Sequence, residues 1–117
     1  MTRTVYRRFY QGAVEWKLYL GDCDDPELKP LGKGQGACEG STMFGESGIV
    51  INIGLPVRER PPTIVHEMLH AAFHSSGISH AIGISMKKEE QITHALAPFL
   101  AQALVTGGFW KHPRGEE

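Results

Sequence analysis

The fold of this chain is decided by residues 62–76, whose sequence is PTIVHEMLHAAFHSS. Pro62 suits the first turn of a helix, because that turn does not need its missing N–H, and Gly77 supplies a stop just after the stretch. We therefore predict a helix over residues 62–76 whose apolar stripe packs on a sheet. The apolar residues that recur at helical spacing are Ile64, Val65, Met68, Leu69, Ala72 and Phe73.

Strands are predicted before this helix. Residues 5–10 and 14–20 are rich in aromatic and β-branched side chains with partial alternation, and Gly12 between them predicts the turn of a hairpin. Residues 49–53 form a short β-branched run flanked by glycines, which predicts another strand. The intervening residues 21–48 are rich in Gly, Pro, Asp and Ser, so we expect a long loop with at most one short strand.

A second helix is predicted over residues 86–105, after a short loop of small residues at 77–85. The predicted fold is α+β, with a small, mostly antiparallel sheet packed against helix 62–76 and the second helix beside it. Residues 1–106 are expected to form a single domain, and residues 107–117 a loosely ordered tail. The side of the second helix expected to face inward consists of Ile92, Ala95, Leu96, Phe99 and Ala103.

The composition fits one compact domain. The chain has 117 residues, 41% hydrophobic and 21% charged, and its formal net charge of -1 gives no positive field that would favour nucleic acid as a partner. It contains no apolar run of the roughly 18 residues that a membrane span needs, and its polar start lacks the apolar segment of a secretory signal. We expect a cytoplasmic protein with Cys23 and Cys38 as reduced thiols, because neither has metal-ligand spacing. The sequence does not indicate an oligomeric state.

The chemistry is carried by His66, Glu67 and His70, which spell HExxH inside the first predicted helix. Histidines four apart lie one turn above each other on the same helix face, so both imidazoles can reach one metal ion. Zinc suits this set, because it accepts imidazole nitrogen and carboxylate oxygen in a tetrahedral site and leaves a fourth position for water. Glu67 would lie close enough to take a proton from that water without being a ligand. The structural alternative is a solvated helix face.

A site of this kind needs a third protein ligand, and the residues alone leave several open. On a helical wheel Glu89 falls near the apolar side of the second helix and Glu90 toward its flank, which favours Glu89. His80 completes, with His70 and His74, the HxxxHxxGxxH spacing of metzincin sites, although Ala71 stands where their catalytic glutamate belongs. The candidates are Glu89, Glu90, His74, His80 and His94.

Around this motif the chain resembles gluzincin-type zinc metallopeptidases, in which a second helix carries a glutamate ligand. It resembles more closely the small peptidases of the ImmA/IrrE type and the short phage metallopeptidases, over about half of its length. The chain departs from their pattern at Leu69, where glycine is usual, and at His94, where an acidic residue or asparagine is usual. The matching segments are Ile49-Val50-Ile51-Asn52, Arg58-Glu59-Arg60, the HExxHxxxH of residues 66–74, and Glu90-xx-Thr93-xx-Leu96-Ala97-xx-Leu100.

The resemblance implies a minimal metallopeptidase domain that hydrolyses protein or peptide substrates. It implies that His66, His70 and Glu90 bind Zn²⁺, with Glu67 as general base and His94 as an outer partner of a ligand. It also implies that the strand at 49–53 lies at the sheet edge, where an extended substrate adds as a further strand.

Two alternatives remain beside this interpretation. One is a zinc-binding interaction module without useful turnover. The intact Glu67 argues against it, because a site that only binds metal does not need a glutamate there. The other is a SprT-like peptidase site with His80 as the third ligand. No helix-turn-helix segment accompanies the motif, so we do not expect a regulatory role of the ImmA kind.

Overall fold

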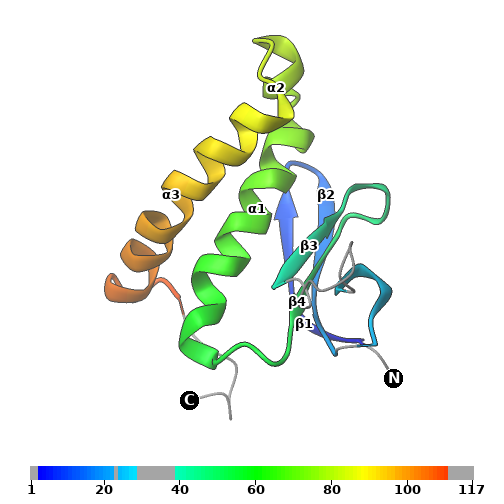
Figure 1. Cartoon of the computed structure of the whole chain (residues 1–117), viewed down its shortest axis with the longest axis vertical. Coiled ribbons are helices and arrows are strands. Elements are labelled where there is room, and N and C mark those ends of the chain that lie inside the picture. The colour runs from blue at the N-terminus through cyan, green and yellow to red at the C-terminus, as the bar shows by residue number, and fades with distance from the viewer. Residues whose placement is uncertain (1–2, 23, 29–38, 111–117) are drawn as a thin grey trace.

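The computed structural model describes residues 3–22, 24–28 and 39–110, so Cys23 and Cys38 lie outside the described residues. Within them, four strands form one mixed sheet in the order β1-β2-β4-β3 (Figure 1). β1 (Arg3–Gln11) and β2 (Val14–Gly21) form the predicted antiparallel hairpin. β4 (Gly48–Asn52) runs parallel to β2, and β3 (Gly40–Met43) pairs antiparallel with β4. The α+β prediction is confirmed.

The strand predicted at residues 49–53 is present as β4, but its predicted place at the sheet edge is wrong. β4 lies between β2 and β3, and Ile49, Val50 and Ile51 are each 0% exposed. An unbroken apolar run is typical of a strand that is covered on both faces. The edge strand on this side of the sheet is β3, the one short strand that the prediction for residues 21–48 allowed. The sequence does not locate it, because Gly-Ser-Thr-Met has neither an apolar period nor strong strand propensity.

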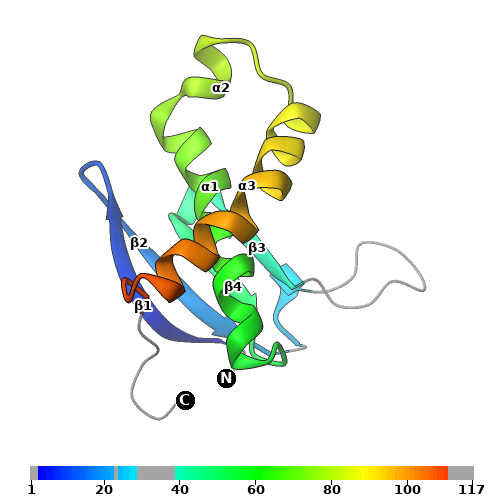
Figure 2. The same ribbon diagram turned by 90° about the vertical axis from the view of Figure 1, so that its left-hand side faces the viewer.

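Helix α1 (Arg60–Ser76) lies between the sheet and helix α3 (Met86–Thr106), as Figure 1 shows; in Figure 2 α3 lies in front. The helix predicted over 62–76 is therefore present, and it begins two residues earlier. The contact between α1 and the sheet is the main core of the molecule. Each aliphatic side chain buried there contributes about 1.5–3 kcal/mol to stability. The fully packed residues of this core are Trp16, Leu18, Leu20, Ile49, Ile51, Ile64 and Ala71.

The other face of the sheet is covered by the 3-10 turn η1 (Pro26–Leu28), whose Leu28 packs on Val50 and Met43. An ion pair fixes this turn to the start of β1. Arg3 donates to both carboxylate oxygens of Asp25, at 2.9 and 2.7 Å, and Asp25 is 0% exposed. Two further 3-10 turns, η2 (Phe44–Glu46) and η3 (Val57–Glu59), flank β4.

The predicted inward side of α3 is wrong. Leu96 is 47% exposed and Phe99 is 73% exposed. Helix α3 instead packs on α1 through small residues that are buried, namely Thr93, Ala97 and Ala101. α1 already covers the sheet at this point, so α3 packs against a helix, where small side chains allow close approach of the two backbones. Leu69, at the position where the peptidases that this chain resembles in sequence usually have glycine, packs in this same cluster.

Two segments expected to be irregular contain local structure. The predicted loop at 77–85 contains a short helix, α2 (Ile78–Ala81), which follows Gly77 at φ 69°. Of the predicted tail, Trp110 packs against the main core, whereas residues 111–117 lie outside the described residues. No helix in the described part of the chain is both long and apolar enough to cross a bilayer.

Candidate metal centre

Three side chains from two helices meet at one point. His66 and His70 lie one turn apart on α1, with ring centroids 4.9 Å apart, and Glu90 reaches them from the first turns of α3. Its Oε1 lies 3.1 Å from Nε2 of His66, and its Oε2 lies 2.8 Å from Nε2 of His70. The ligand atoms of this trio all lie within 4.8 Å of one another, so the trio could hold a metal ion.

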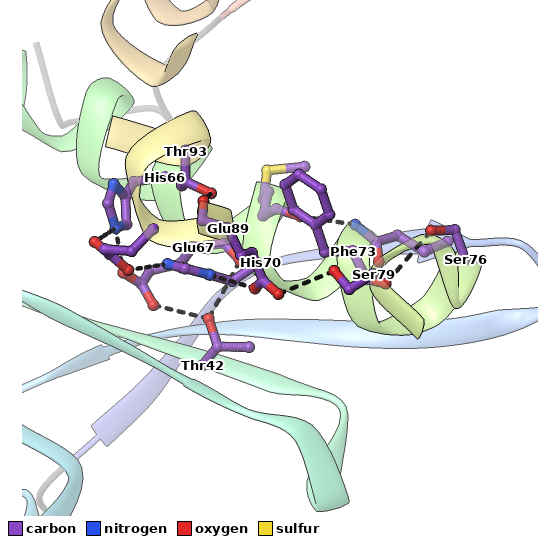
Figure 3. Close-up of polar contacts among 12 residues, drawn as sticks. Thr42, His66, Glu67, His70, Phe73, Ser76, Ser79, Glu89 and Thr93 are labelled. Atoms are coloured by element: carbon purple, nitrogen blue, oxygen red, sulfur yellow. Dashed lines mark hydrogen bonds and ion pairs between the residues drawn. The ribbon is translucent and has the colours of Figure 1, made fainter. Parts of the chain in front are cut away.

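The neighbouring Glu89 contacts the far side of the His70 ring. Nδ1 of His70 donates to Oε1 of Glu89 at 2.8 Å, and Ser79 donates to the other oxygen at 3.1 Å (Figure 3). The side chain of Glu89 is 17% exposed, whereas that of Glu90 is 56% exposed. A carboxylate on one ring nitrogen fixes the tautomer and leaves the other nitrogen free for a metal. Glu89 therefore orients His70, and Glu90 contacts the other ring nitrogen, Nε2.

Negative charge gathers around His70 and affects the pKa of its imidazole. Burial acts to lower the pKa of His70, because it disfavours the charged imidazolium. The hydrogen bond to Glu89 and the charges of Glu90 and Glu67 outweigh burial, so the pKa of His70 lies above its ordinary value. The same charge would attract a cation of higher valence to this place.

Glu67 lies beside the trio without belonging to it. Its side chain is 11% exposed, and its Oε2 lies 3.9 Å from Nε2 of His66. Thr42, on the edge strand β3, donates to Oε1 of Glu67 at 2.7 Å (Figure 3). Gly40 gives the glutamate room, because a Cβ at that position would lie 3.2 Å from Cγ of Glu67. The carboxylate is thus held between α1 and β3.

The trio and Glu67 open into a hollow of about 990 Å³ between β3 and the start of α3. Apolar side chains line part of its wall, among them Phe44, Phe73 and Met86. His74 also lines it, with its ring centroid 4.7 Å from that of Phe44. A hollow with apolar walls and a few converging polar groups is the usual form of a small binding site in proteins.

The remaining candidate ligands lie farther from this point. His80 is exposed on α2 and lines the same hollow. His94 is exposed on α3, and its ring centroid lies 6.3 Å from that of His66. Among the described residues, the group within ligand distance contains neither of them, nor His74.

Sequence reasoning missed the roles of Thr42 and Ser79. Thr42 lies in β3, whose position within residues 21–48 the sequence does not predict, so no pattern points to its contact with Glu67. Glu89 was named only as a rival ligand, whereas in the structure it contacts the back of the His70 ring. The signal that could have found this contact is the pair of adjacent glutamates at the start of a helix.

The donor set fits zinc in chemical terms. Two imidazole nitrogens and one carboxylate oxygen are a usual set for a zinc site that keeps one position for water. The ligand atoms of the trio already lie within 4.8 Å of one another. The chain matches no family model, no curated protein and no solved structure. The side chains of this site are therefore the basis for assigning a function.

Proposed function

We propose that this chain is a zinc-dependent metallopeptidase that hydrolyses peptide bonds. The observation that carries the proposal is the position of Glu67, a largely buried carboxylate beside the trio His66, His70 and Glu90 but outside it. A site that only stores a metal does not need a carboxylate there, whereas hydrolysis needs a base.

The side chains would divide the work as follows. His66, His70 and Glu90 would hold the ion, and Glu89 would keep Nε2 of His70 directed at it. Zinc, when bound, supplies a Lewis acid that polarises the scissile carbonyl and makes a neighbouring water more acidic. Glu67 takes the proton from the attacking water and passes it to the leaving amine.

The sheet edge supports a peptide as substrate. Asn52 donates its N–H to the carbonyl of Glu39 at 2.8 Å, so these two residues form a hydrogen-bonded pair. Such pairs alternate along an antiparallel ladder, and the next one is Ser41 with Val50. The backbone groups of Gly40 and Thr42 therefore point away from β4, to the side of β3 on which no other described strand pairs, and an extended peptide can add there as a strand. The strand that would bind the substrate is therefore β3 and not the strand predicted at 49–53.

The test is Glu67→Gln in the zinc-loaded protein. We expect the variant to keep one zinc per chain and the wild-type thermal unfolding, but to cleave an unstructured peptide library at least about 10²-fold more slowly, since a positioned base contributes about 10² to 10⁴ in rate. Glu46→Gln, at an exposed glutamate on η2, is the matched control and should cleave normally.

A wild-type protein that binds zinc and cleaves no member of a broad peptide library would overturn the proposal. The chain would then be a zinc-binding interaction module, and the hollow beside the trio would be the place to look for its ligand.

A further inference from the structure

We infer that Thr42 is a positioning residue for Glu67, and that it links substrate binding at the sheet edge to the orientation of the base. The inference rests on the proposed function. It concerns one residue of β3 whose side chain and backbone face two different parts of the site.

The side chain contacts one carboxylate oxygen of Glu67. Oγ1 of Thr42 lies 2.7 Å from Oε1 of Glu67 and 3.2 Å from its backbone carbonyl oxygen. A hydroxyl has one proton to donate, and the shorter contact to a charged group is the stronger one. The other oxygen, Oε2, is the one near His66. Thr42 thus holds Oε1 and leaves Oε2 facing the ligand trio, where a base must act.

The backbone of Thr42 is held by its neighbours in β3. Thr42 is opposite Ile49, which is fully buried in β4, and the adjacent Met43 is 8% exposed. Side chains one residue apart in a strand point to opposite faces, so the burial of Met43 on one face directs Thr42 to the helix face. Because the strand is fixed in this way, the Thr42 hydroxyl loses little conformational entropy when it binds Glu67.

The N–H and C=O of Thr42 point away from β4, as the ladder register above requires, to the side where none of the described strands pairs with β3. A substrate strand that added to β3 would bond to these groups. The residue that then binds the peptide backbone is the same residue whose hydroxyl orients Glu67, so a peptide in register would also be presented to an aligned base. The group that links the two functions is the Thr42 hydroxyl.

The experiment compares Thr42→Val with Thr42→Ser in the zinc-loaded protein, with kcat and KM measured separately. Valine keeps the branched shape and removes the donor, so we expect kcat to fall about tenfold to a hundredfold while KM and zinc content stay near the wild-type values. Serine restores the donor and should recover most of kcat. Thr4→Val, at an exposed threonine of the opposite edge strand, is the matched control.

A double variant shows whether Thr42 acts through Glu67. In the Glu67→Gln background, Thr42→Val should lower the residual rate by less than twofold, because the base it orients is gone. A full further loss would show that Thr42 acts by another route and would overturn the inference. Equal kcat for wild type and Thr42→Val would overturn it too.

The metal-free protein gives a readout that does not depend on cleavage. Thr42→Val and Glu67→Ala should each shift the urea midpoint, and their combined shift should be smaller than the sum of the two, because both remove the same hydrogen bond. Strict additivity would contradict the contact itself. An inactive wild type with non-additive shifts would instead overturn the proposed function and the catalytic part of this inference, and leave the contact standing.

Discussion

Nδ1 of His70 donates a hydrogen bond to Glu89 at 2.8 Å, from the side of the ring opposite to the nitrogen that contacts Glu90. Two consecutive glutamates of one helix thus contact both nitrogens of a single imidazole. Their contacts give them different roles: Glu89 orients the ring, and Glu90 completes the group that could hold a metal. The side chain of Glu89 is also the less exposed of the two.

This relationship separates the effects of the two glutamates on metal affinity. Glu90→Ala removes a proposed ligand and should weaken zinc binding more than Glu89→Ala, for which a loss of about tenfold to a hundredfold is expected because a hydrogen-bond partner of His70 is removed. Calorimetric titration of zinc into each variant measures both. Glu89→Ala weakening zinc more than Glu90→Ala would reverse the assignment, and a loss seen only with His80→Ala would support the SprT-like ligand set.

Zinc should raise the thermal stability of the protein. Free zinc at a hundredfold excess over its Kd stabilises the folded state by about 2.7 kcal/mol, and the double variant His66→Ala with His70→Ala should lose this gain. Differential scanning calorimetry with and without zinc measures it, and His74→Ala, an exposed histidine on the same helix, is the control. An equal rise in Tm for the double variant would place the zinc elsewhere.

Asp25→Ala should be one of the more damaging substitutions far from the site. It leaves the guanidinium of Arg3 without the carboxylate that accepts two of its hydrogen bonds. Breaking a fully buried ion pair costs about 3–5 kcal/mol, and because the Arg3 side chain is 26% exposed we expect a loss of about 2–3 kcal/mol here. Urea unfolding gives the free-energy change. Asp24→Ala, at an exposed neighbour, should change it by less than about 0.5 kcal/mol.

Trp110→Ala should destabilise the fold by about 1–3 kcal/mol, since its ring packs on the main core from beyond the end of α3. Phe109→Ala should have little effect, because Phe109 is 80% exposed. Thermal unfolding of the two variants makes the comparison. If Trp110→Ala lowers stability no more than Phe109→Ala does, the packing of Trp110 on the core adds nothing beyond an exposed aromatic side chain.

The parts that could be predicted from the sequence are those whose signal is local. The β1–β2 hairpin follows from alternation about Gly12, and α1 follows from its 3.6-residue period between a proline and a glycine. His66 and His70 lie four residues apart, so their proximity follows from helix geometry alone.

The parts that could not be predicted depend on packing between distant segments. Nothing in Gly-Ser-Thr-Met indicates an edge strand, and the contact between Thr42 and Glu67 spans 25 residues of sequence. The orientation of α3 was predicted from its apolar stripe, but the packing of small residues on α1 decided it. Periodicity identifies an apolar face; it does not reveal that another helix already covers the sheet.

The close packing of α3 on α1 also suggests how distant relatives of this chain can be recognised. Thr93, Ala97 and Ala101 set the separation of the two helices and thereby the reach of Glu90, although these three side chains lie outside the group that could hold a metal ion. Selection on the site should therefore act on their size as well as on the ligands. A search pattern that combines HExxH with a glutamate 20 residues after the second histidine, followed by small residues at 3, 7 and 11 positions beyond it, encodes this constraint. It would favour chains in which the glutamate can reach the histidines over those in which HExxH occurs by chance.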